Sequence, residues 1–360
     1  MKGESGEVSE MQPRERFMGA LRREEMDKVP LLNRYMGPVM AKLAPIYGAV
    51  GRELEIKLGN DALMVQIGIN AEYSHKVIGE GEVYTSEWGV TYQRVNGFNQ
   101  PVKHPLREQN LAGYTFPDPD LPARMTEIQD VMARYHPRYA VVVDLSCTLF
   151  EAGFHLRGME NFLMDAYENE DFVYEVLEKL AEYYTALGVH AVRQGVDMIR
   201  IGDDVGIQTG LVMPTEKWRH LVKPHIERMI RAFREVNPDI LVKYHSCGDL
   251  YSIIPDLLEL KVDLIGTMQP CGQLQDPFRI KQEFGQQVSF LGGLDVQQLL
   301  PFGSPAQVRE GVRTVLKAYA PGGGYIFMPA HYINVDVPLE NIWALLQALS
   351  DFRDYPLQLD

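Results

Sequence analysis

The sequence predicts an α/β protein built as a single (β/α)8 barrel of the TIM-barrel class. Short and almost continuously apolar segments, typical of buried parallel strands, alternate with helical segments along most of the chain. Eight such strands can be counted, which favours a closed barrel over an open, doubly wound sheet. No glycine-rich fingerprint of a dinucleotide or phosphate site follows any of them.

Length and composition agree with this prediction. The 360 residues are 46% hydrophobic and 23% charged, as in ordinary globular proteins, and barrels often use this length for one domain. The net charge of −14 argues against nucleic-acid binding, because phosphate backbones need clustered Lys and Arg. Three cysteines make no disulfide framework, and no apolar run suits a membrane span or a signal peptide. We therefore expect a cytoplasmic, reduced protein that binds neither nucleic acid nor membrane.

The predicted elements follow in order from a polar start, residues 1–12, which we expect to be disordered. A helical extension at 13–23 begins with proline, which suits the first helical position because the N–H it lacks would be unpaired there anyway. The eight strands are predicted at 31–36, 62–67, 139–144, 197–203, 240–245, 262–268, 288–292 and 324–329. The other helices are predicted at 51–58, 123–134, 160–194, 216–236, 250–260, 276–284, 305–319 and 338–353.

Residues 69–120 interrupt the alternation after the second strand. The run EVYTSEWGVTYQRV alternates in polarity and predicts a hairpin, and FPDPD is a proline-rich connection. We interpret this segment as an insertion that forms a lid or wall over a substrate. Tyr35 on the first strand, with Trp88 and Tyr92 in the insertion, are candidates for the wall of an apolar pocket. Simple core or hairpin packing is the alternative role for each.

Polar side chains recur where the predicted strands end. In barrels of this class the chemistry takes place at these C-terminal ends, and repeated polar residues at one rim are hard to explain as packing. The residues are Asp144, Cys147, Glu151, Asp203, Asp204, His245, Cys247, Gln269, Cys271, Asp295 and His331.

The sequence LVKYHSCGD predicts a metal site at the end of the fifth strand. His245 and Cys247 are two residues apart, so their side chains face the same side of the strand, and imidazole and thiolate are zinc ligands. His331 is the preferred third ligand because the eighth strand opens onto the same mouth, and Cys271 is the reserve candidate. The alternative for the pair is a buried histidine bonded to backbone beside an inert thiol.

The carboxylates at these strand ends have three candidate roles. Glu151, Asp203 and Asp204 could each ligate the metal, act as acid or base, or cap the helix that follows. Three protein ligands suffice for a catalytic zinc, which keeps one position open for water or substrate.

Several motifs in this order resemble the uroporphyrinogen decarboxylase superfamily. They are GDDVGIQTG, HSCGD, MQP, GGLD and GGGYIFMPAH followed by VPLENI, and the early segments DKVPLLNRYMG, SEWGVTY and FHLRGMENFLMDAYENEDFV fit as well. The resemblance spans nearly the whole chain. It implies one barrel domain over residues 1–360, with its site at the C-terminal mouth.

The resemblance leaves two branches to choose between. The decarboxylase proper acts on a tetrapyrrole without metal and carries an arginine-rich motif of the type MRQAGRY. Here the corresponding stretch, LLNRYMGPVM, offers only Arg34, too few cations for a substrate with many carboxylates. The chain resembles the other branch, the corrinoid-linked methyltransferases, whose zinc is bound by His-x-Cys and a later cysteine. His245 and Cys247 match the first two positions, and His331 stands at the third.

We therefore predict a zinc-dependent methyltransferase. It would move a methyl group between a small methylated substrate, such as an aryl methyl ether undergoing O-demethylation, and a corrinoid (cobalamin). No cobalamin-binding segment is evident, so the corrinoid would arrive on a partner protein. Imidazole in place of thiolate removes a negative charge and makes the zinc a stronger Lewis acid. Glu151 or Asp203 would fill the fourth zinc position or handle a proton, and Gln269 and Asp295 would orient substrate.

Two alternatives remain open from the sequence. One is a metal-free decarboxylase or lyase that acts on a polycarboxylate with the same barrel. The other is a non-catalytic docking subunit for a corrinoid protein. A homodimer is compatible with the resemblance, since barrels of this family type often pair.

Overall fold

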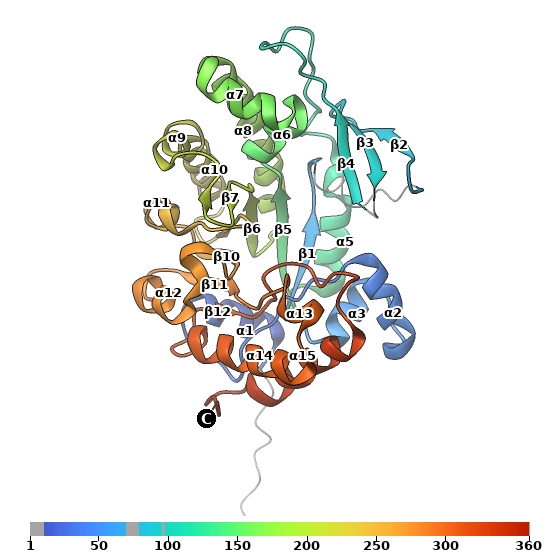
Figure 1. Cartoon of the computed structure of the whole chain (residues 1–360), viewed down its shortest axis with the longest axis vertical. Helices are drawn as coiled ribbons and strands as arrows, with labels where there is room; N and C mark the ends of the chain where they lie inside the picture. The colour runs from blue at the N-terminus through green and yellow to red at the C-terminus, as the bar shows by residue number, and fades with distance from the viewer. Residues whose placement is uncertain (1–10, 70–78, 96–97, 360) are drawn as a thin grey trace, which may run out of the picture.

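The computed structural model describes residues 11–69, 79–95 and 98–359 (Figure 1). Most of the start predicted to be disordered lies outside these ranges. In the described part of the chain, no helix combines the length and apolar character needed to cross a membrane.

Seven parallel strands form the central sheet, in the order β1-β5-β6-β9-β10-β11-β12. All seven coincide with predicted strands, and they are almost entirely buried because helices cover the outer face and side chains fill the inside. Their bounds are β1 (Ala62–Gln66), β5 (Ala140–Ser146), β6 (Met198–Gly202), β9 (Leu241–His245), β10 (Leu264–Met268), β11 (Ser289–Gly292) and β12 (Tyr325–Ile326).

The predicted first strand, 31–36, is not a regular strand. Its segment instead links the two edges of the curled sheet. On one side Leu31 forms an isolated parallel bridge with Phe327, just after β12. On the other, the Asn60 side chain accepts a bond from Asn33 N and donates one to Asn33 O, both 2.9 Å long. A side chain therefore supplies the hydrogen bonds that a neighbouring strand would, and we call residues 31–36 the seam.

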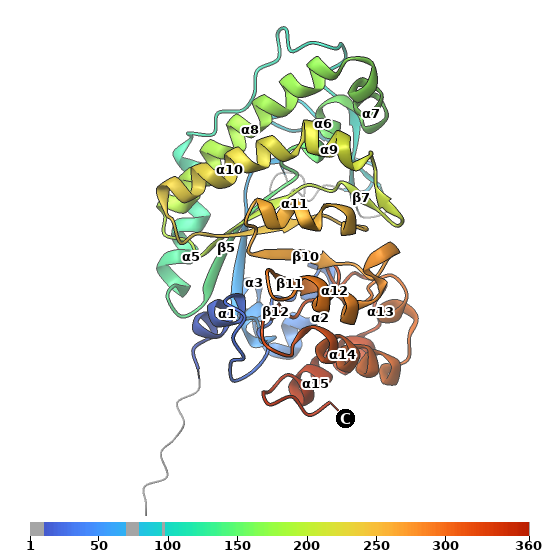
Figure 2. The ribbon, with the colours of Figure 1, turned by 90° about the vertical axis from the view of Figure 1, so that its left-hand side faces the viewer.

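Helices cover the outside of the sheet, with α8 packed on α10 along one side and α14 on α15 along the other (Figure 2). The helices predicted at 160–194 are α7 and α8, which meet at Asn169, whose side chain caps α8, whereas the single helix predicted at 216–236 is divided ahead of Pro224. The longer helices are α1 (Pro13–Leu21), α2 (Gly37–Tyr47), α3 (Gly51–Lys57), α5 (Thr126–Tyr135), α6 (Phe150–Arg157), α7 (Met159–Glu168), α8 (Glu170–Arg193), α9 (Thr215–Leu221), α10 (Lys223–Val236), α11 (Ile254–Glu259), α12 (Pro277–Phe284), α14 (Pro305–Tyr319) and α15 (Leu339–Phe352).

The insertion carries a three-stranded antiparallel sheet, β2 (Val83–Thr85), β3 (Thr91–Val95) and β4 (Phe98–Lys103). The expected hairpin is present, and β4 adds a strand that was not predicted. The fully buried Trp88 ring, between β2 and β3, packs 4.7 Å from the Tyr183 ring on α8. This contact fixes the insertion against the barrel.

Candidate metal centre at the strand ends

Three side chains from two distant parts of the chain converge at the C-terminal ends of the strands. His245 is the last residue of β9, Cys247 follows two residues later, and His331 lies in the loop after β12. Their ligand atoms all lie within 4.8 Å of one another, with Cys247 Sγ 4.0 Å from His245 Nε2. His245 is buried, Cys247 half-buried and His331 exposed, so the group opens toward solvent on one side.

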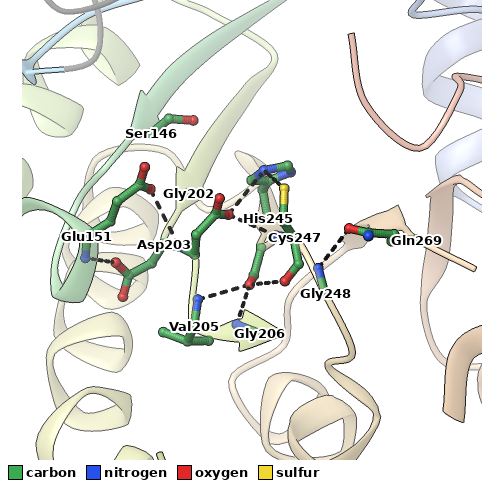
Figure 3. Close-up of polar contacts among 12 residues, drawn as sticks. Ser146, Glu151, Gly202, Asp203, Val205, Gly206, His245, Cys247, Gly248 and Gln269 are labelled. Atoms are coloured by element: carbon green, nitrogen blue, oxygen red, sulfur yellow. Dashed lines mark hydrogen bonds and ion pairs between the residues drawn. The ribbon is translucent and has the colours of Figure 1, made fainter. Parts of the chain in front are cut away.

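The turn that carries Cys247 is held by close backbone packing between the loops after β6 and β9. Gly248 has φ +80°, and a Cβ there would lie 2.4 Å from the Gly206 carbonyl carbon. Ser246 adds a second link, because its hydroxyl accepts hydrogen bonds from the backbone N–H of Val205 (3.1 Å) and Gly206 (3.2 Å) (Figure 3). The glycine pair is needed for this approach, which fixes where the thiol points.

Polar side chains from neighbouring strand ends surround the group. Asp204 accepts a 2.8 Å hydrogen bond from Cys247 N, and the same oxygen lies 3.5 Å from His245 Nε2. The Gln269 side chain accepts from Gly248 N at 2.9 Å. Asp204 is therefore the carboxylate next to His245 and the backbone of Cys247. Gln269 braces the turn from the other side (Figure 3).

The carboxylates Glu151 and Asp203 lie one step further away. Asp203 accepts a 2.7 Å hydrogen bond from Glu151 N in the first turn of α6, which is a capping geometry. Burial raises the pKa of Asp203 to about 7. Burial, followed by the nearby Asp204 charge, raises the pKa of Glu151 well above its usual range. Glu151 therefore holds a proton near neutral pH while no cation is bound close to it.

A layer of buried charge lies beneath the group. Asp144, Arg200 and Lys243 sit side by side in the register of β5, β6 and β9, all less than 10% exposed. Arg200 pairs with Asp144, whereas Lys243 has no hydrogen-bond or ion-pair partner among the described residues. Burial, followed by the Arg200 charge, lowers the pKa of Lys243 well below its usual range, so an ion pair and a weakly basic amine form the floor of the site.

This floor affects the imidazole above it. Burial, followed by the charges of Arg200 and Lys243, lowers the pKa of His245 well below its usual range. His245 is therefore neutral at physiological pH, which is the form that binds a metal. The nitrogen, sulfur and nitrogen donor set matches the ligand preference of zinc.

A cavity of about 810 Å³ opens over these residues. Its walls include Cys247, Gln269, His331, Tyr332 and Phe302. Two of the three ligand side chains thus face a space large enough for a small organic molecule.

The sequence pattern of the uroporphyrinogen decarboxylase (URO-D) family matches residues 89–352. This chain belongs to the URO-D family. A uroporphyrinogen decarboxylase from Legionella pneumophila (strain Lens) is 26% identical over 208 residues, which are 58% of this chain and 55% of the relative. A methylated-thiol–coenzyme M methyltransferase from Methanosarcina mazei is 23% identical over 232 residues, 64% of this chain and 58% of the relative. The matches thus span little more than half the length of these curated relatives.

A solved methyltransferase from Methanosarcina mazei has the same fold as this URO-D chain. Its TM-score is 0.71 at 20% sequence identity, and the match covers 95% of this chain and 99% of the other. At this identity the likeness concerns the fold, and it agrees with the predicted TIM-barrel-like architecture.

The predicted substrate residues of the URO-D chain lie away from the walls of the large cavity. Tyr35 bridges Ile333 in the barrel wall, Trp88 anchors the insertion, and the Tyr92 hydroxyl bonds to His155 at 2.8 Å. All three are buried, which is the packing role weighed as the alternative. Contact with substrate stays a prediction for each.

Of the two residues predicted to orient substrate in the URO-D chain, one lines the cavity and the other lies in a loop. Gln269 lines the cavity, as its proposed contact with substrate requires. Asp295 accepts bonds from the backbone N–H of Gln297 (2.6 Å) and Gln298 (3.0 Å), so it shapes a turn. Sequence reasoning missed Lys243, although its position two residues before His245 places it on the same inward side of β9.

Proposed function

We propose that this URO-D family chain is a zinc-dependent methyltransferase. It transfers a methyl group between a small methylated compound, with aryl methyl ethers as the first candidates, and the corrinoid of a separate protein. The observation that carries the proposal is the convergence of His245, Cys247 and His331 on one point beside the large cavity. The similarity to a Methanosarcina mazei methyltransferase supports the same reaction class.

The ligand residues fit a catalytic zinc better than a structural one. Three protein donors leave a position open, and His331 and Cys247 border the cavity. When bound there, zinc supplies Lewis acidity toward the oxygen that leaves the methyl group. Asp204 would be the carboxylate nearest to a bound zinc, because one oxygen lies 3.5 Å from His245 Nε2.

The protein's own residues position the substrate and handle its proton. The cavity admits a small substrate from the C-terminal face of the barrel, where a partner protein could also dock. Gln269 offers an amide at the cavity wall to orient a polar group. Asp204, whose carboxylate lies 3.5 Å from His245 Nε2, is the candidate to hold or move a proton beside the ligand atoms, since Glu151 does not border the cavity.

The test is zinc content and methyl transfer measured on the same samples. Protein purified without added metal or a histidine tag should contain zinc, and Cys247→Ser and His331→Ala should each lose it from this site. Methylation of cob(I)alamin by a panel of aryl methyl ethers, followed by visible absorbance, should fall with the zinc. Cys271→Ser is the matched control, because Cys271 is a buried thiol outside the group. A wild type that stays free of metal after incubation with zinc would refute the proposal.

One observation favours a second candidate, a metal-free decarboxylase or lyase. The basic side chains of Arg34, Arg200 and Lys243 lie near one another at the barrel floor, where burial and the two arginines lower the pKa of Lys243. A bound polycarboxylate would pair with the arginines and favour protonation of this lysine. This candidate requires turnover of a polycarboxylate by metal-free protein, with Cys247→Ser fully active and Arg200→Met inactive. Loss of that turnover in Cys247→Ser would exclude it.

A further inference from the structure

A second group of metal-binding side chains lies beside the first. Cys147 follows β5, and Glu151 and His155 are one helical turn apart on the same face of α6. Their ligand atoms all lie within 4.8 Å of one another. Cys147 and His155 are buried and Glu151 is half-buried. We propose that these three residues form a second divalent-metal site, of the class that prefers zinc.

The donor set is the first argument. A thiolate, an imidazole and a carboxylate are the three side-chain types that bind zinc in proteins, and the soft thiolate disfavours magnesium or calcium. Cys147 adopts φ +61°, a backbone conformation in which a non-glycine residue is uncommon. This conformation occurs at the one residue of the group that lies outside a regular element.

The surroundings of His155 are the second argument. Its Nδ1 atom lies 2.8 Å from the hydroxyl of Tyr92, which reaches it from β3 of the insertion. A hydrogen bond at one ring nitrogen fixes the plane and tautomer of an imidazole, as outer partners of metal-bound histidines do. Burial lowers the pKa of His155 to about 3, so the ring is neutral.

The charge balance around Glu151 is the third argument. The Glu151 carboxylate accepts a 3.4 Å hydrogen bond from Asp204 N, and Asp203 accepts one from the backbone N–H of Glu151. The second oxygen of Asp203 is buried without a hydrogen-bond partner. Among the described residues no lysine or arginine pairs with Glu151 or Asp203. A divalent cation at the second group would offset this concentration of buried acid.

The two groups are adjacent but separate. They share no residue, and Asp204 lies between them, touching His245 through its carboxylate and Glu151 through its backbone. Figure 3 shows Glu151 on the β5 side of Asp203, away from Cys247. The second site faces the insertion rather than the large cavity, whose walls contain none of its three residues.

The test counts metal ions per chain in the wild type, in two single variants and in their double variant. The full chain, loaded with zinc and freed of excess, should hold about two zinc ions. Cys147→Ser and Cys247→Ser should each hold about one, and the double variant almost none. Cys271→Ser should keep the wild-type count. Circular dichroism establishes that each variant is folded, and cobalt titration of the wild type gives a count without any substitution, because thiolate–cobalt absorbance should rise through about two equivalents.

The outcomes separate this inference from the proposed function. A wild-type count in Cys147→Ser, or thiolate–cobalt absorbance that saturates at one equivalent, would overturn the second site. A single ion lost from both single variants would also overturn it, because one ion would then be shared. Loss in Cys147→Ser with a wild-type count in Cys247→Ser would instead refute the catalytic site and leave this inference standing.

Discussion

His331 differs from a cysteine in the charge that it brings to a metal. A neutral imidazole adds no charge, whereas a thiolate would donate more electron density and lower the Lewis acidity of the ion. Strand parity was enough to pair His245 with Cys247 from the sequence. His331 required the further assumption that all strand ends meet at one mouth, and the structure does bring the three together. Their role as zinc ligands stays a prediction.

Replacing His331 by cysteine tests this difference directly. His331→Cys should keep its zinc and lose methyl transfer from aryl ethers by about tenfold or more, equivalent to at least about 1.4 kcal/mol of transition-state stabilisation. Zinc analysis and the cob(I)alamin assay on one preparation give both quantities. Unchanged rates with retained zinc would show that ligand charge does not set the reactivity.

Polar residues at strand ends illustrate what sequence patterns leave undecided at the residue scale. Asp203 and Asp295 both follow strands, yet each accepts hydrogen bonds from backbone N–H groups: Asp203 from Glu151 at the start of α6, and Asp295 from Gln297 in its own loop. A carboxylate that caps a loop and one that contacts substrate have the same sequence signature. Only the direction of the side chain distinguishes the two, and that direction depends on loop conformation.

At the scale of elements, the regular strands and long helices followed the predicted pattern, and the departures have local causes. α2 begins with Gly37-Pro38 and contains Pro45, residues that normally indicate a turn. α6 contains Gly153, which marks a close helix contact: a Cβ there would lie 2.3 Å from the Phe162 ring of α7. Packing against neighbours thus overrides local propensity in both helices.

The contact between the loops after β6 and β9 should be sensitive to one added methyl group. Gly248→Ala places a Cβ against the Gly206 backbone, which cannot give way as a flexible side chain could. We expect the free energy of unfolding to fall by roughly 1–3 kcal/mol or more, and zinc affinity to fall because Cys247 moves. Urea unfolding and competition with a zinc chelator measure the two effects.

Gly322→Ala is the matched control for this substitution. Gly322 has a similar backbone angle, φ +74°, but nothing lies within 4 Å of its Cβ position. It should lose the smaller stability of a strained backbone alone and keep its zinc affinity. Equal losses of stability and of zinc affinity in Gly248→Ala and Gly322→Ala would mean that neighbouring groups move to relieve the steric clash of the added Cβ.

At the scale of the whole molecule, the sequence predicted the barrel class and the order of the parallel strands. It did not predict how the sheet is closed, because apolar residues in the seam resemble those of a strand. The side chains of Asn60 and Asp61, with one backbone bond from Asp61 N to Leu31 O, join the seam to the start of β1 in place of a continuous backbone ladder. Such a join depends on polar side chains reaching across the gap, which no periodicity reveals.

Asn60→Ala should weaken the seam selectively. It removes both hydrogen bonds to the Asn33 backbone, and two groups without partners cost roughly 2–6 kcal/mol together, at about 1–3 kcal/mol each. Amide hydrogen exchange at 31–36 should accelerate more than exchange in β5 or β6. The exposed Asn110→Ala, which also loses a backbone contact, should leave the seam unchanged. Equal protection of 31–36 in both variants would contradict this account.

The seam also orders events during synthesis of the chain. Its partners come late: Leu31 pairs with Phe327, and just before it Val29 donates to the carbonyl of Arg353 at 2.8 Å. The ring therefore stays open on the ribosome until these residues have emerged, however early the seam itself was made. His331 follows Phe327, so His245 and Cys247 cannot be joined by the third metal-binding side chain before this late segment has been made. Closure of the ring and assembly of the metal-binding group thus become possible within the same late stretch of translation.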